Sequence, residues 1–139
     1  MVKVDSQYDI FDNFKTDCFF EIMFLGALFE TKGRGVGTAV VQASIELAQK
    51  LKTKNENPSS DIDVTSEAKE FGGSEGLKRV PTVVTAIFTS RFSQRVGKRN
   101  GMTPMLEIPY TEFEYKGRKY SEVTVSDHPS CQLCCRRLD

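Results

Sequence analysis

One short segment, in which a strand, a glycine turn and a helix follow one another, constrains the fold of this chain most. Residues 18–28, CFFEIMFLGAL, are almost all apolar or aromatic, as expected of a strand covered on both faces. Gly33, Gly35 and Gly37 then alternate along the chain. Residues 37–53 show helical spacing of apolar side chains. The face they predict consists of Val40, Val41, Ser44, Ile45, Leu47, Ala48 and Leu51.

A tight turn of this kind is suited to binding an anion. Unpaired backbone N–H groups converge where a helix begins, and the helix dipole favours negative charge there. Glycine lets the backbone approach a phosphate without a Cβ in the way, and it allows a positive φ. Lys32 and Arg34 add cations to the turn. The alternative is a helix start that needs glycine for its geometry alone, and the neighbouring cations favour the anion site.

Two nucleotide-binding patterns fit the turn poorly. The loop G-x-x-x-x-G-K-[ST] requires a Gly-Lys-Ser/Thr sequence, which does not follow these glycines. The pattern G-x-G-x-x-G matches Gly33 and Gly35 but has Thr38 in place of the last glycine. An acidic residue at the end of a following strand, about 20 residues on, is also missing. Neither a nucleoside triphosphate nor a dinucleotide is therefore the expected ligand.

The middle of the chain predicts a polar connection, a strand and a short helix. Residues 53–79 lose their apolar period, so we expect a mobile loop, or a weak helix near residues 66–71. The β-branched residues of 80–89 predict a second buried strand. Residues 90–100 predict a helix that Ser90 caps, with Phe92 and Val96 facing inward.

The C-terminal part predicts two further strands. Residues 101–113 favour a turn followed by a strand, in which Pro109 indicates an edge position or a bulge. Residues 115–119 are expected to form a loop. The final segment predicts a strand with Cys131, Leu133 and Cys135 on one face. The whole order is typical of an α/β fold, and residues 1–139 are expected to form a single domain.

Composition excludes several classes of partner. Lysine and arginine together number 19, and so do aspartate and glutamate, so no net field favours nucleic acid or an anionic membrane. No apolar run approaches the ~18 residues of a membrane span, and the start shows no secretory signal pattern. Cysteines grouped towards one end are expected to be reduced thiols in the cytosol.

A possible zinc pattern is set aside. His128, Cys131, Cys134 and Cys135 give H-x-x-C-x-x-C-C. A strand points Cys134 and Cys135 to opposite faces, so both do not readily ligate one ion. We expect no metal site, and no catalytic cysteine.

The glycine segment, FFEIMFLGALFETKGRGVGTAVVQASIELAQKL, resembles motif A of the GNAT superfamily of acyl-CoA N-acyltransferases, [QR]-x-x-G-x-[GA]. Lys32, Gly35 and Gly37 hold the motif positions, with lysine where arginine or glutamine is usual. FTSRFSQRVGKRNGMTPMLEIPYTEF resembles the family's late strand, helix and turn, and EIPYTEF…QLCCRRL is most similar to the insect arylalkylamine N-acetyltransferase-like branch. The resemblance covers roughly residues 10–138. It implies a GNAT-type mixed sheet with helices on both faces, lacking the usual N-terminal strands and helices.

The resemblance implies acetyl-CoA as co-substrate. The turn residues that would hold its pyrophosphate are Lys32, Gly33, Arg34, Gly35, Val36, Gly37 and Thr38. The strand before the turn would pair with the pantetheine arm at Leu25, Gly26 and Ala27, and Ser93 matches a position near the cofactor. Arg91, Arg95, Lys98 and Arg99 form a basic helix surface that is either solvated or partly directed at the 3′-phosphate.

The implied reaction is direct attack of a small amine, such as an arylalkylamine, on the thioester. A base must take the ammonium proton, and Glu21 is the candidate because apolar residues flank it and it matches the general base of histone-acetylating members. A solvated or ion-paired carboxylate at the end of the sheet is the alternative. Gly97 stands where many members carry a tyrosine that protonates the thiolate. A non-catalytic CoA-binding protein is the rival function, and the sequence does not decide between a monomer and a homodimer.

Overall fold

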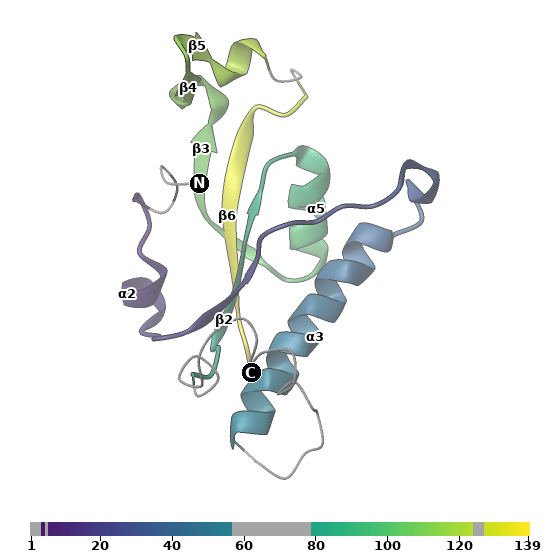
Figure 1. Ribbon diagram of the computed structural model, residues 1–139, viewed down its shortest axis with the longest axis vertical. Coiled ribbons are helices and arrows are strands. Elements are labelled where there is room, and N and C mark those ends of the chain that lie inside the picture. The colour runs from purple at the N-terminus through teal and green to yellow at the C-terminus, as the bar shows by residue number, and fades with distance from the viewer. Residues whose placement is uncertain (1–3, 5, 57–78, 124–126) are drawn as a thin grey trace.

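The computed structural model describes residue 4 and residues 6–56, 79–123 and 127–139 (Figure 1). The polar connection predicted to be mobile, with its weak helix at 66–71, lies outside these residues except at its two ends. Among the described helices, none combines the length and the apolar character that crossing a membrane requires.

A mixed four-stranded sheet forms the centre of the fold, in the order β1-β2-β6-β3. The strands are β1 (Phe19–Ile22), β2 (Val83–Phe88), β3 (Thr103–Pro109) and β6 (Ser130–Arg137). β1 is parallel to β2, whereas β6 is antiparallel to both β2 and β3. Helices lie on both sides of this sheet (Figure 1), so the predicted mixed sheet with helices on both faces is confirmed.

Two helices, α3 (Val36–Glu56) and α5 (Arg91–Arg99), cover one face. Val41, Ile45 and Ala48 of α3 are buried there. The sheet and its connections contribute Val84, Ala86, Phe88, Met102, Cys134 and Leu138. Val40 and Leu47, which were expected on the core face of α3, are exposed, because the stripe that meets the sheet is narrower and consists of Val41, Ile45 and Ala48.

The N-terminal segment covers the other face, although its sequence predicts no element. Its helix α2 (Ile10–Phe14) begins at Asp9, whose carboxylate accepts the Asp12 N–H at 3.0 Å. Apolar side chains of this segment pack with one face of the sheet. They are Val4, Tyr8, Ile10 and Phe14, against Val83, Ile108, Cys131, Leu133 and Cys135. The predicted inward face of the last strand is confirmed.

The strand expected at residues 18–28 is shorter than predicted. Its first part forms β1, but the chain leaves the sheet after Ile22, and Phe24 is 89% exposed. β1 lies at the edge of the sheet and pairs with β2 on one side, so the prediction that both faces are covered is wrong beyond Ile22.

The strand at the other edge of the sheet agrees with the edge position or bulge that Pro109 predicted. β3 is an edge strand whose register shifts between Pro104 and Leu106. The expected loop at 115–119 is a small hairpin of β4 (Glu114–Tyr115) and β5 (Arg118–Lys119). The short 3₁₀ helices η3 (Tyr110–Glu112) and η4 (Tyr120–Glu122) flank this hairpin.

We expect the stability of the fold to decrease in alkali because of two buried thiols. Burial raises the pKa of Cys134 to about 11 and that of Cys135 to about 12. In the unfolded chain a thiol titrates near pH 8.5. The stabilisation is therefore complete below about pH 8.5 and is lost as the pH rises toward the folded-state pKa values. Urea unfolding under reducing conditions measures it.

The comparison is between about pH 7.5 and about pH 10, where the free energy of unfolding should be lower. Replacing both thiols, Cys134→Ala with Cys135→Ala, should reduce this difference. A wild-type chain equally stable at the two pH values would contradict the burial of these thiols.

Candidate functional site

Parallel strands separate at the entrance to the site. The pairing of β1 with β2 runs from Phe19↔Val83 to Ile22↔Ala86, and β2 then continues to Phe88 beside β6. The chain after Ile22 instead runs to the 3₁₀ helix η1 (Phe29–Thr31), away from β2 (Figure 1). Among the described strands, none pairs with residues 23–28. The Leu28 carbonyl accepts hydrogen bonds from Thr31, but the backbone before it is not used by a described strand and could pair with an extended ligand.

The glycine turn follows η1 and leads directly into α3. Gly33 and Gly35 have φ values of +79° and +78°, which side chains rarely adopt. A Cβ built on either residue would meet no heavy atom within 4 Å. The outer side of the turn is thus open.

The first backbone N–H groups of α3 precede the hydrogen bonds of the helix and lie at this turn. The Ala39 N–H donates to the Gly35 carbonyl at 3.0 Å. The N–H groups of Val36, Gly37 and Thr38 come before it in the first helical turn, where an α-helix has no acceptor of its own to offer. They carry the positive end of the helix dipole, which favours an anion.

Helix α5 is fixed beside the turn. The Asn100 side-chain amide donates to the Thr38 carbonyl at 3.2 Å and to the Val96 carbonyl at 3.0 Å. A Cβ on Gly37 would lie 3.6 Å from Val96 Cγ2, so the two helices approach closely there. Residues far apart in sequence therefore form one wall.

The start of α5 is a capping box. Ser90 Oγ accepts the Ser93 N–H at 3.1 Å, and Ser93 Oγ accepts the Ser90 N–H at 3.1 Å. The predicted cap is confirmed. The Ser93 hydroxyl, proposed to lie near a cofactor, is engaged in this box.

A cavity of about 520 Å³ lies between the glycine turn and α5, within the range of ligand sites. We call it the glycine-turn cavity. It is lined by Ala27, Thr31, Lys32, Gly33, Gly35, Val36, Gly37, Thr38, Phe92, Arg95, Val96 and Arg99. Lys32, Arg95 and Arg99 make its lining cationic. Lys32 Nζ lies 5.6 Å from the Phe29 ring centroid, and the Arg95 guanidinium lies 5.6 Å from that of Phe92.

Most of the residues expected to hold a cofactor line this cavity. They are Ala27, Lys32, Gly33, Gly35, Val36, Gly37 and Thr38. Leu25, Gly26, Arg34 and Ser93 do not line it. Leu25 packs against the core instead, and a Cβ on Gly26 would meet nothing within 4 Å.

One wall of the cavity was foreseen only in part, since Arg95 and Arg99 were expected on a basic surface but Phe92 and Val96 were assigned to the core. Phe92, Arg95, Val96 and Arg99 are spaced i, i+3, i+4 and i+7, which places them along one side of α5. That spacing was a usable signal. Phe92 was expected to face the core, but it is 60% exposed and lines the cavity.

Glu21 lies one residue before the strands separate. It pairs with Thr85 in the register of β1 and β2 and is exposed. Thr85 and Glu21 share a sheet face opposite to the side that α3 and α5 cover.

His128 contacts the start of α5 and has no metal-binding neighbours in the described structure. Its Nδ1 accepts the Arg91 N–H at 3.4 Å, and its ring meets that of Phe92 edge-on at 5.4 Å. Cys134 and Cys135 belong to different sides of the sheet, as their adjacency in a strand predicts. Within the described residues, no group of His, Cys, Asp and Glu could hold a metal ion.

Solved structures of N-acetyltransferases share this fold. Arylalkylamine N-acetyltransferase 2 from Aedes aegypti matches with a TM-score of 0.68 at 20% identity, over 99% of this chain and 51% of its own. Polyamine N-acetyltransferase from Drosophila melanogaster matches with a TM-score of 0.66 at 17% identity, over 98% of this chain and 52% of its own. The putative arylalkylamine N-acetyltransferase 7 from Aedes aegypti matches with a TM-score of 0.65 at 21% identity, over 100% of this chain and 46% of its own.

These likenesses establish a GNAT-type fold. The chain spans about half the length of each of these proteins. No protein-family model and no curated protein sequence matches it.

Proposed function

We propose that this chain binds acetyl-CoA and transfers its acetyl group to the primary amine of a small molecule. The observation that carries the proposal is the glycine-turn cavity, in which open glycines, the first N–H groups of α3 and three cations line one space. The fold shared with N-acetyltransferases supports the same reaction.

The pyrophosphate would bind at the glycine turn. Val36, Gly37 and Thr38 offer backbone N–H groups, while Lys32 and Arg95 offer charge. Arg99, near the end of α5 and in the lining of the same cavity, would meet a further phosphate of this ligand.

The pantetheine arm would extend along residues 25–27. Its amides can pair with backbone that no described strand uses, and the thioester would then lie where β1 and β2 separate. Backbone N–H groups of the same segment would stabilise the developing oxyanion. The amine nitrogen attacks the carbonyl carbon and the C–N bond forms. The C–S bond then breaks, and the leaving thiolate takes up the proton that the attacking nitrogen loses, which gives the amide and the CoA thiol.

Glu21 is the proposed general base. It lies one residue before β1 and β2 separate, and it would accept the proton that the ammonium group must lose, through a water that reaches round the edge strand β1. The reaction requires a proton acceptor, because the ammonium nitrogen has no lone pair with which to attack.

Calorimetric titration with acetyl-CoA, followed by turnover on arylalkylamines and polyamines, tests the proposal. We expect Glu21→Gln to bind acetyl-CoA as the wild type does but to lower kcat by about 100-fold, since a general base contributes 10²–10⁴. Because Glu21 is exposed, the variant should fold normally. Glu46→Gln, an exposed carboxylate on α3, is the matched control and should retain activity.

Different failures have different meanings. Absence of acetyl-CoA binding would refute the proposal. Binding without turnover on any amine would favour the alternative, a non-catalytic CoA-binding protein, which the exposure of Glu21 also favours. Full activity in Glu21→Gln would assign the base elsewhere.

A further inference from the structure

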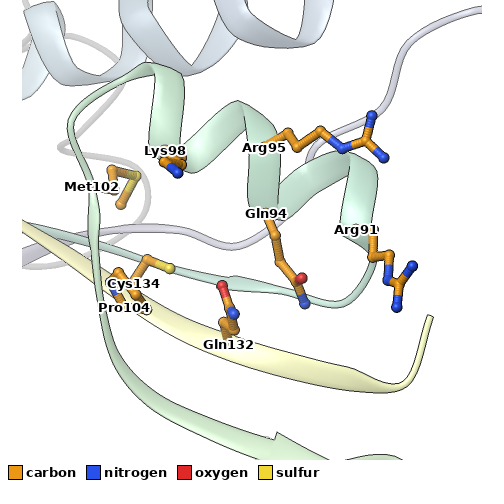
Figure 2. Close-up of a pocket in the computed structure, with 8 residues that line it drawn as sticks. All are labelled: Arg91, Gln94, Arg95, Lys98, Met102, Pro104, Gln132 and Cys134. Carbon is orange, nitrogen blue, oxygen red and sulfur yellow. The ribbon is translucent and has the colours of Figure 1, made fainter. Parts of the chain in front are cut away.

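A second cavity lies on the other side of α5. It has a volume of about 420 Å³ and opens between α5 and the strands β3 and β6 (Figure 2). We call it the α5–β6 groove. It is lined by Arg91, Gln94, Arg95, Lys98, Met102, Pro104, Gln132 and Cys134.

The helix α5 gives the two cavities sets of side chains that share one residue, Arg95. Arg91, Gln94, Arg95 and Lys98 repeat at i, i+3, i+4 and i+7, one residue behind the set that lines the glycine-turn cavity. Arg95 borders both cavities, and its guanidinium stacks on Phe92. Lys98 belongs to the groove alone, whereas its neighbour Arg99 belongs to the glycine-turn side.

The wall of the groove is positively charged and supplies hydrogen bonds. Within the described residues, no carboxylate forms an ion pair with Arg91, Arg95 or Lys98. Gln94 and Gln132 point into the gap between helix and strand (Figure 2). The Gln94 Nε2 donates to the Ser130 carbonyl at 3.0 Å, which fixes the side chain and leaves its oxygen as an acceptor.

One carboxylate lies beside the groove. Glu107 pairs with Gln132 across β3 and β6, and its Oε1 accepts a hydrogen bond from the Ser130 hydroxyl. Its charge is thus partly satisfied outside the lining. Three cations against this single carboxylate leave the groove with a positive excess.

The floor of the groove is apolar. Met102 and Cys134 are buried at 3% and 2% exposure, and Pro104 offers a ring without a donor. A ligand that fits both the cationic wall and the apolar floor has a compact anionic group, which contacts the wall, and an apolar group, which packs on the floor. Two arginines and a lysine suit a dianionic head better than a single carboxylate.

From this geometry we infer that the α5–β6 groove is a second anion site, separate from the glycine-turn cavity, which binds small phosphate monoesters with an apolar group. The inference does not depend on acetyl transfer. It concerns the groove itself, whichever ligand occupies the glycine turn.

Phenyl phosphate is the probe, titrated into the full ¹⁵N-labelled chain. We expect amide shifts in α5 and the facing part of β6, weaker binding of inorganic phosphate, and no binding of benzyl alcohol. Lys98→Gln and Arg91→Gln should each lower the affinity for phenyl phosphate about tenfold by removing a charged contact. All of these side chains are exposed, so the variants should fold.

Arg99→Gln is the matched control, one residue from Lys98 on the other side of the helix. It should leave phenyl phosphate binding unchanged. Arg95 is left intact because it borders both cavities. Absence of shifts in α5 at about 20 mM probe would overturn the inference. Loss of phenyl phosphate binding in Arg99→Gln but not in Lys98→Gln would also overturn it. So would a Lys98→Gln variant that loses as much affinity for acetyl-CoA as for phenyl phosphate, since the groove would then be part of the cofactor site.

Discussion

Gly35→Val is expected to abolish acetyl-CoA binding. Gly35 has a φ of +78°, and no heavy atom lies within 4 Å of the position its Cβ would take, so the space beside it is available to a ligand. Valine would place a branched side chain in that space and would strain the turn by about 1–2 kcal/mol. We expect affinity to fall by at least about 100-fold, or about 3 kcal/mol, in calorimetric titration.

Gly117→Val separates loss of the site from loss of stability. Gly117 has a φ of +75° and equally open surroundings, but it lies in the hairpin of β4 and β5. The two variants carry a similar backbone strain, and only Gly35→Val should lose binding. Unchanged affinity in Gly35→Val would place the ligand elsewhere. Equal weakening in both variants would trace the effect to folding.

The glycine turn was predictable because its signal is local. A positive φ is a property of one residue, and three alternating glycines before a helical period indicate both the turn and the direction of the helix dipole. Ser90 at the start of α5 is equally local, since the cap needs a side-chain oxygen and the next turn of backbone. The alternation of Cys131, Leu133 and Cys135 follows from strand geometry alone.

Features that depend on distant partners were not predictable in this way. Phe24 looks like a core residue, but the chain leaves the sheet after Ile22, so the Phe24 ring is not packed against the sheet and is 89% exposed. The N-terminal segment has few apolar residues, yet these are enough to cover the second face because they meet buried positions of β2 and β6. The Phe92 ring was assigned to the core by spacing, which does not distinguish a core from a cavity wall.

The close approach of Gly97 to the Phe88 ring explains why α5 has a glycine at position 97. A Cβ on Gly97 would lie 2.2 Å from Phe88 Cε2 and 2.8 Å from Cδ2. Phe88 is 3% exposed and packed in the core between the sheet and the helices, so its ring has little space to move. Any side chain at position 97 would begin with the same clash. The tyrosine that the family resemblance would place there cannot be introduced while Phe88 remains.

Gly97→Ala is therefore expected to destabilise the fold although alanine favours helices. Overpacking of this severity costs about 3 kcal/mol, and the gain in helix propensity returns about 1 kcal/mol, which leaves a loss of about 2 kcal/mol. Urea unfolding measures the loss. Gly37→Ala, where the new Cβ would meet Val96 Cγ2 at 3.6 Å, is the helical control and should be nearly neutral.

A double-mutant cycle with Phe88→Leu identifies the ring as the cause. Leucine lacks the ring atoms that the new Cβ would meet, so the double variant should be more stable than the sum of the two single changes predicts, by about 1–2 kcal/mol. Strict additivity would contradict the clash. If the coupling is found, the same cycle shows what a tyrosine at position 97 requires. The space for any side chain there must first be vacated by Phe88, a core residue against which α5 packs.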